Sequence, residues 1–219
     1  MNASYQQIPQ AAGREIRSDG LVTRKLLLQC AGEIFARRGY SDTTSKEICE
    51  RANATVGSVN YHFGSKAGLY REILTEVTQR ILRLEMLEAI AVSRRPAKEK
   101  LEEILDTVLA AQASQDWQIR LFFRELASPS AEFINYLSQD ASSKTGIIKR
   151  ILSEILGATA DSMVVDQCFL SVFSLCSFPY MANANVLANC ISPTSCEAAA
   201  LHSHIKRFIL AGLDVHVAR

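Results

Sequence analysis

Hydrophobic residues recur along this chain at the spacing of α-helices. In the first regular stretch the apolar side chains return every three or four positions, on one helical face formed by Leu27, Ala31, Ile34 and Phe35. Gly39 follows where a glycine commonly ends a helix. No segment shows the alternation of apolar and polar residues that a half-buried strand needs. The pattern predicts an all-α protein.

Two short helices are predicted next. Thr44 followed by Glu47 has the capping-box pattern, in which a threonine and a glutamate three residues later satisfy amide groups at the start of a helix. This pattern predicts a second helix that runs to about Ala52. Thr55 can cap a third helix that continues through Tyr61.

The link between these two helices has the composition of a tight turn. Asn53 lies in it, and asparagine is one of the few residues that tolerate the left-handed backbone conformation. Two short helices joined in this way predict a helix-turn-helix at roughly residues 44–62. The side chains of Val56–His62 are mostly small or polar, so this helix can enter the major groove and reach phosphates or base edges.

A long fourth helix, capped by Ser65, is predicted to carry one apolar stripe to Leu84 and to break at Arg94–Pro96. Helical periodicity then continues in five segments: Leu101–Leu109, Ile119–Leu126, Phe133–Leu156 (one long or broken helix), Met163–Tyr180 and Leu201–Leu213. Met163–Tyr180 is apolar on nearly every side and must be covered on every side. One face can line an interior and the other can meet a second subunit, with Leu201–Leu213 completing a four-helix interface.

The charge of the chain is concentrated near its N-terminus. Because 48% of the residues are hydrophobic, the chain can form a core. Because its net charge is only +1, any affinity for nucleic acid must come from a local basic patch. Between Leu21 and Arg71 eight basic side chains stand against four acidic ones. Lys66 lies at the first turn of the fourth helix, where it can meet a DNA phosphate beside the partial positive charge of the helix N-terminus.

Residues 22–74 resemble the N-terminal domain of the TetR/AcrR regulators. The resemblance rests on Arg37-Arg38-Gly39-Tyr40, Thr43-Thr44, Ile48, Thr55-Val56-Gly57-Ser58-Val59, Tyr61-His62-Phe63 and Lys66, in the order and spacing of that family. It implies contacts with DNA at Thr44, Thr55, Gly57, Ser58, Tyr61, His62 and Lys66. Two positions depart from the family pattern, because Asn53 replaces its usual glycine and Asn60 its usual tyrosine.

The resemblance also implies a helical body that binds a small ligand and forms a dimer. Phe122–Pro129 and the helix after it are similar to the CecR-like subgroup. The candidates for a pocket lining are aromatic, namely Trp117, Phe122, Phe123, Phe169, Phe173 and Tyr180, with Arg120, Arg124 and Glu125 as polar anchors. Aromatic residues at helical spacing are equally typical of an ordinary core.

Other classes of protein find little support in the sequence. There is no phosphate-binding loop, dinucleotide fingerprint, nucleophile elbow or zinc-protease helix, so neither a catalytic residue nor a cofactor is expected. The six cysteines are scattered, and Cys190, Cys196, His202 and His204 match no standard metal pattern. The apolar run Met163–Phe178 includes Asp166 and is short for a membrane span, and no signal peptide is recognised, so a cytoplasmic protein without a membrane association is expected.

The sequence therefore predicts three segments: a flexible arm (1–20), a three-helix helix-turn-helix head that binds DNA (21–70), and a helical body for ligand binding and dimerisation (71–219). The expected function is a ligand-responsive regulator, by family habit a repressor. It would bind a near-palindromic, double-stranded operator as a homodimer and be released by a small apolar or aromatic effector. The alternative is a helical protein that binds small molecules or senses redox state without binding an operator.

Overall fold

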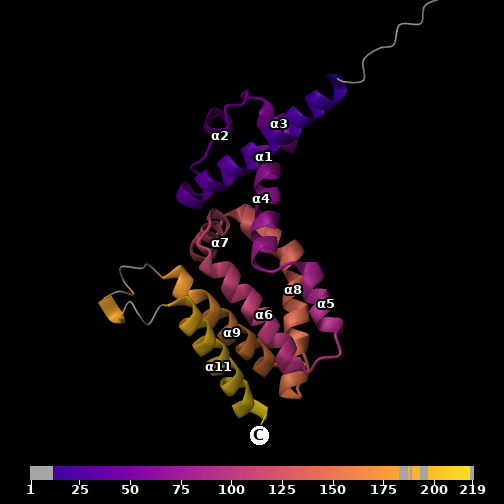
Figure 1. Ribbon diagram of the computed structural model, residues 1–219, viewed down its shortest axis with the longest axis vertical. Helices are drawn as coiled ribbons and strands as arrows, with labels where there is room; N and C mark the ends of the chain where they lie inside the picture. Colours follow the sequence, from indigo (N-terminus) through magenta and orange to yellow (C-terminus); the bar gives the residue numbers. More distant parts are fainter. Residues whose placement is uncertain (1–11, 183–186, 188, 193–196, 218–219) are drawn as a thin grey trace, which may run out of the picture. The chain divides into compact units, whose positions relative to one another are not determined.

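The computed structural model describes residues 12–182, 187, 189–192 and 197–217 (Figure 1). Ten helices and no strand occur in these residues, which confirms the predicted all-α fold. The helices are α1 (Ala12–Arg38), α2 (Ser45–Arg51), α3 (Ser58–Phe63), α4 (Lys66–Ile81), α5 (Leu84–Val92), α6 (Ala97–Ala113), α7 (Trp117–Ala127), α8 (Ala131–Leu156), α9 (Met163–Met181) and α11 (Ala198–Val217).

The chain forms two compact units, Met1–Ile73 and Leu74–Arg219. The boundary predicted from the sequence, after residue 70, lies slightly earlier in the same helix. Helix α4 contributes its first half to one unit and its second half to the other. The two units are therefore joined through continuous helical backbone.

Helix α1 buries the predicted face, because Leu27, Ala31, Ile34 and Phe35 are at most 2% exposed. It ends at Gly39, whose φ of 88° suits a glycine and whose amide donates to the Phe35 carbonyl at 2.8 Å. The helix begins earlier than predicted, so residues 12–20 are helical where an arm is expected; residues 1–11 lie outside the described part. The polar composition of residues 12–20 does not exclude a helix, because alanine, arginine and glutamate form helices well.

The short helices begin and end largely as the sequence predicts. Thr44 Oγ1 accepts a hydrogen bond from the Glu47 amide at 3.2 Å and caps α2, and Asn53 has the predicted left-handed backbone with a φ of 49°. Ser65 Oγ accepts from the Gly68 amide at 3.0 Å at the start of α4. Thr55, however, does not cap α3, since the N-cap position is Gly57 and Thr55 closes a turn just before it.

The predicted long fourth helix is two helices, because the chain bends at Leu82 and Arg83. Neither glycine nor proline causes this bend. Arg83 is extended, with a ψ of 135°, and the bend lets Leu82 and Leu87 both enter the core of the second unit. Tertiary packing thus decides a boundary that the local sequence does not mark.

The core of the second unit lies among α5, α6, α8, α9 and α11, which run alongside one another in Figure 1. Leu105 from α6, Ile151 and Leu152 from α8, and Ile209 from α11 are all nearly inaccessible to solvent. Helix α8 is continuous and stops at Gly157, whose backbone is left-handed with a φ of 62°. The resulting bundle holds the cavity described below.

Gly68 provides a test of how closely α3 and α4 approach each other. A Cβ atom at this position would lie 2.1 Å from the Phe63 carbonyl oxygen, so we expect Gly68→Ala to lower the free energy of unfolding by about 1–3 kcal/mol. Gly20→Ala is the control, because a Cβ there meets nothing within 4 Å on helix α1 and should raise stability by about 0.5–1 kcal/mol. Urea unfolding measures the change in the free energy of unfolding for both variants. Equal changes in the two variants would contradict a close approach of α3 and α4 at Gly68.

Candidate DNA-binding surface and ligand cavity

The helix-turn-helix is built on buried apolar residues that leave its polar residues outside. Ile48 of α2 and Val59 of α3 are fully buried. Phe63 is only half-buried and lies under the Arg24 guanidinium at 5.0 Å. These contacts fix the orientation of α2 and α3, and therefore which of their side chains face solvent.

The residues expected to contact DNA lie around this exposed surface. Thr44, Thr55, Gly57 and Tyr61 are exposed, the last by 85%, while Ser58 and His62 are half-buried. The hydroxyls of Thr55 and Ser58 share a hydrogen bond of 2.9 Å, and the Tyr61 and His62 rings touch edge to face. Six of the seven predicted contacts are therefore at least partly accessible to solvent, on or beside α2 and α3.

Lys66, the seventh predicted contact, has its ammonium group inside the unit. Its Nζ atom donates to the carbonyls of Thr43 at 2.8 Å and Tyr40 at 3.0 Å, and lies 4.1 Å from the centre of the Tyr40 ring. The first residue of α4 thereby holds the loop that leads to Thr44. Sequence reasoning missed this positioning role because the two carbonyls belong to a loop more than twenty residues away.

Several basic side chains of this unit are engaged in surface ion pairs. Arg38 pairs with Glu47, and Arg51 pairs with Glu33. Exposed pairs of this kind add little stability, but they reduce the positive charge that each arginine presents. The charge excess counted from the sequence is therefore larger than the charge available to a polyanion.

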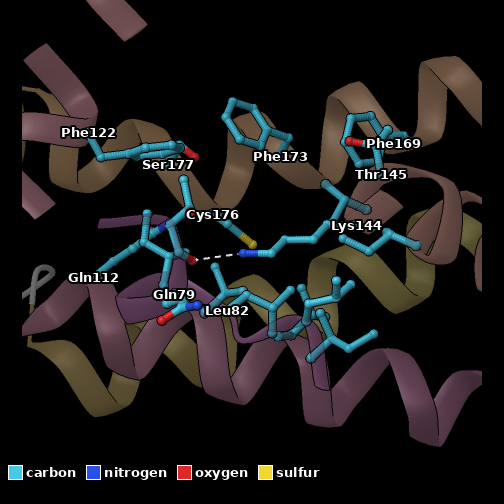
Figure 2. A pocket seen from close by; sticks show the side chains of 18 of the residues that line it. Gln79, Leu82, Gln112, Phe122, Lys144, Thr145, Phe169, Phe173, Cys176 and Ser177 are labelled. Carbon is cyan, nitrogen blue, oxygen red and sulfur yellow. Dashed lines mark hydrogen bonds between the residues drawn. The ribbon is translucent and has the colours of Figure 1, made fainter. Parts of the chain in front are cut away.

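A cavity of about 540 Å³ lies within the second unit, lined by residues of α4 to α9 (Figure 2). Its volume falls in the range of about 300–1,000 Å³ that is usual for small-molecule sites. Apolar side chains form most of the wall, among them Leu82, Leu105, Val108 and Ile148. An apolar ligand could pass from water into contact with this wall without losing hydrogen bonds to water.

Only part of the predicted aromatic lining reaches this cavity. Phe122, Phe169 and Phe173 line it, and the last two rings are stacked with centroids 6.4 Å apart. Trp117, Phe123, Tyr180 and the exposed Arg124 do not. On α7 the helical period explains why Phe122 alone lines the cavity among the predicted residues. Trp117, Phe123 and Arg124 lie five, one and two positions from it, so their side chains point in other directions.

The other predicted anchors serve the protein's own backbone. Glu125 is buried, and its carboxylate accepts hydrogen bonds from the amide and hydroxyl of Ser130, both at 2.8 Å. Arg120 donates to the Gln115 carbonyl at 2.7 Å. These interactions stabilise the ends of α7 and α8 rather than a ligand.

Two family matches cover both units of the chain. Residues 27–73 match the tetR family of bacterial regulatory proteins, and residues 97–213 match the C-terminal domain of the HTH-type transcriptional dual regulator CecR. The chain belongs to the TetR family. Its second unit has the CecR type of C-terminal domain.

Similar proteins include regulators and solved structures of the same family. The HTH-type transcriptional regulator AcrR of Shigella flexneri is 29% identical over 125 residues, which cover 57% of each protein. The structure of NalD, secondary repressor of the MexAB-OprM efflux pump in Pseudomonas aeruginosa, has a TM-score of 0.63 at 19% identity and covers 89% of this chain and 97% of NalD. FadR of Bacillus subtilis, solved in complex with stearoyl-CoA, has a TM-score of 0.65 at 17% identity. The match covers 86% of this chain and 98% of FadR. The chain spans less than two thirds of the length of several curated relatives, including AcrR and the SrpR regulator of Pseudomonas putida (62%).

The cavity of this TetR-family chain also has polar lining residues that the sequence analysis missed. Gln112 and Ser177 are only 2% and 4% exposed, and Lys144 Nζ donates to the Thr78 carbonyl at 3.1 Å. A signal for the first of these was present, because Gln112 continues the apolar stripe of Leu101, Leu105 and Val108. A polar residue at a core-facing position indicates a cavity or a hydrogen-bond network.

Helix α9 is apolar along its whole length. It is the one helix in the described part of the chain that is long and apolar enough to cross a membrane by length and composition. The apolar run Met163–Phe178, expected to be short for a membrane span, continues as a helix to Met181. It packs against α6, α8 and α11 of its own unit and leaves an apolar stripe on the opposite side.

Cys176 lines the cavity, and burial raises the pKa of its thiol to about 12. The thiolate fraction at pH 8 is then about one in ten thousand, so we expect iodoacetamide to label exposed Cys190 long before Cys176 in the folded protein. Peptide mass spectrometry over time measures both rates, and urea-unfolded protein is the control in which the two rates should converge. Equal rates in the folded protein would contradict the burial of Cys176 and revive a redox role for it.

Proposed function

We propose that this protein is a ligand-responsive transcriptional regulator that binds a near-palindromic operator as a homodimer and is released by a small apolar molecule. The observation that carries the proposal is the surface of α2 and α3. There Ile48 and Val59 are buried while Thr44, Ser58 and Tyr61 remain accessible to a DNA groove. Repression from the bacterial cytoplasm is the mode of action we infer.

The expected DNA contacts divide into two kinds. Ser58 and Tyr61 on α3 would read base edges or adjacent phosphates, and Thr44 and Thr55 would hold the backbone on either side. Gly57, where an added Cβ would meet open space, lets DNA approach the α3 backbone, and His62 follows on the same helix. Lys66 is proposed to keep Thr44 in position through its two carbonyl contacts, with its remaining proton directed to a phosphate.

A homodimer is supported by apolar residues left exposed on α9 and α11. On α9 they follow one helical stripe and include Met163, Leu170, Phe178 and Met181; on α11 they include Phe208 and Val215. The two helices pack against each other, so their stripes can form one surface. A soluble monomer rarely exposes such a patch, and two copies would bury it as a four-helix interface.

Ligand control is supported by the cavity and by α4. NalD is a secondary repressor of an efflux pump, and FadR was solved in complex with stearoyl-CoA, so one protein of this fold is a repressor and another holds a ligand. In this chain Thr75, Thr78 and Leu82, at the end of α4, line the cavity, and the same helix begins at Lys66 in the first unit. A ligand that shifts α4 would change the separation of the two recognition helices in the dimer and lower operator affinity.

A gel-shift titration with the promoter region flanking the protein's own gene tests DNA binding. The affinity should fall steeply as salt rises, because phosphate contacts release counterions. Footprinting should then show a near-palindrome whose half-sites are about one helical turn, 34–36 Å, apart. Absence of binding at low salt would leave the alternative of a small-molecule-binding protein that does not act on an operator.

Variants of α3 and α4 separate base reading from positioning. Tyr61→Ala and Ser58→Ala should each weaken operator binding by about 1–3 kcal/mol, with a smaller loss on random duplex DNA and unchanged thermal stability. Lys66→Ala should weaken binding to both DNAs and also lower the melting temperature, because two carbonyls lose their donor. Fluorescence anisotropy and thermal unfolding provide the data. Equal losses on both DNAs for Tyr61→Ala would remove its assigned role in sequence reading.

The dimer surface is tested by introducing a charge on it. We expect the wild-type chain to sediment as a dimer at micromolar concentration and Phe208→Asp to shift it toward monomer. Ile134→Asp is the matched control, because Ile134 is similarly exposed (55% against 59%) but lies on α8. A monomeric wild type, or a Phe208→Asp variant that stays dimeric, would contradict the assignment.

A further inference from the structure

Two buried side chains that line the cavity each have a polar atom without a hydrogen-bond partner. These atoms are Gln112 Oε1 on α6 and Ser177 Oγ on α9, and neither has a partner among the described residues. Both residues are buried. A polar group left unpaired in apolar surroundings is costly, and a ligand that binds both atoms would remove this cost.

Several other polar residues of the lining are already engaged or are exposed to solvent. The Thr78 hydroxyl donates to the Thr75 carbonyl at 3.2 Å and shares a hydrogen bond of 2.8 Å with the Tyr136 hydroxyl. The Lys144 ammonium group donates to the Thr78 carbonyl at 3.1 Å and is thus bound within the protein. Gln79 is exposed to solvent. The two unpaired atoms therefore mark the place for the polar part of a ligand.

The two unpaired atoms require different partners. Gln112 Oε1 is a carbonyl oxygen that can only accept, so it needs a donor from the ligand. The Ser177 hydroxyl carries a proton and needs an acceptor for it. A hydroxyl group is the simplest group that offers one donor together with an acceptor oxygen. A carboxylate has no proton to donate, and an ether oxygen can only accept.

We propose that the effector is a neutral, apolar alcohol or phenol whose hydroxyl donates to Gln112 Oε1 and accepts from Ser177 Oγ. This inference rests on the proposed ligand-responsive function and names the chemical class of its ligand. Helices α6 and α9 pack against each other, and Gln112 and Ser177 lie in the same half of the view in Figure 2. The apolar remainder of the ligand extends toward Phe173 and Phe169, the latter in the other half of that view.

The cavity favours a neutral ligand over an ion. An anion would bring its lone pairs against the Gln112 oxygen, which is itself an acceptor. A cation would need an anionic partner, but the one acidic lining residue among those described, Glu85, is exposed to solvent. An unpaired charge in apolar surroundings costs far more free energy than a neutral hydroxyl that finds its hydrogen bonds.

The test compares a hydroxyl compound with its methyl ether, which keeps the acceptor oxygen but has lost the donor. Calorimetric titration of the full-length protein with 2-naphthol and 2-methoxynaphthalene, and with 1-octanol and its methyl ether, gives the affinity ratio on a flat and on a linear scaffold. We expect the hydroxyl compound of the better-fitting scaffold to bind about tenfold or more tightly than its ether. Ratios near one on both scaffolds, or binding of neither hydroxyl compound, overturn the proposal.

A charged analogue tests the preference for a neutral ligand. We expect 2-naphthoic acid, which is ionised at pH 7, to bind more weakly than 2-naphthol in the same titration. Tighter binding of the acid would contradict the proposal, because it would show that an anion is favoured in the cavity.

Variants of the two glutamines locate the donor preference within the cavity. Gln112→Leu should bring the affinities for the hydroxyl compound and its ether together, because the acceptor is gone. Gln79→Leu is the matched control and should retain the preference, since Gln79 also lines the cavity but is exposed to solvent. A preference that survives Gln112→Leu contradicts the proposal. Thermal unfolding should show Gln112→Leu to be at least as stable as the wild type, because it removes an unpaired buried oxygen.

Ser177→Ala tests the second contact separately. It should weaken the hydroxyl compound and its ether alike, each severalfold, because both oxygens accept the Ser177 proton, and the ratio between them should persist. Unchanged affinities would contradict the contact with Ser177. Hydroxyl selectivity in a protein that gives no gel shift would remove the proposed regulation but leave this site standing. A gel shift without hydroxyl selectivity would do the reverse.

Discussion

Helix α4 is held near both ends by a lysine that donates to backbone carbonyls. At its start Lys66 binds the carbonyls of Tyr40 and Thr43, and in its last turn the Thr78 carbonyl is bound by Lys144 of α8. The first contact lies in one unit and the second in the other, and each holds its end of α4 within its own unit. The orientation of Thr44 and the shape of the cavity therefore depend on the two ends of one helix.

The sequence predicts the first unit well because its determinants are local. Thr44 as a cap, Asn53 in the left-handed turn and Gly39 at a helix end each act within a few residues of their place in the chain. The bend at Leu82–Arg83 could not be predicted from the local sequence. It accompanies the burial of Leu82 and Leu87 in a core formed by residues far along the chain. The inward position of Lys66 likewise depends on a loop that only folding brings near.

The lining of the cavity could also be predicted only in part from the sequence. Aromatic residues indicate where apolar volume gathers, but helix rotation decides that Phe122 lines the cavity while Phe123 does not. Polar residues within apolar stripes, such as Gln112 and Ser177, were the better signal for the cavity.

We propose that α4 couples the cavity to the candidate DNA-binding surface, and linkage between the two sites tests this coupling most directly. The affinity for labelled operator would be determined with and without a saturating apolar aromatic compound that binds the cavity, and the affinity for that compound with and without operator. Each partner should weaken the binding of the other by the same factor, as thermodynamic reciprocity requires. An operator affinity that stays unchanged at a saturating concentration of the compound would contradict the proposed coupling.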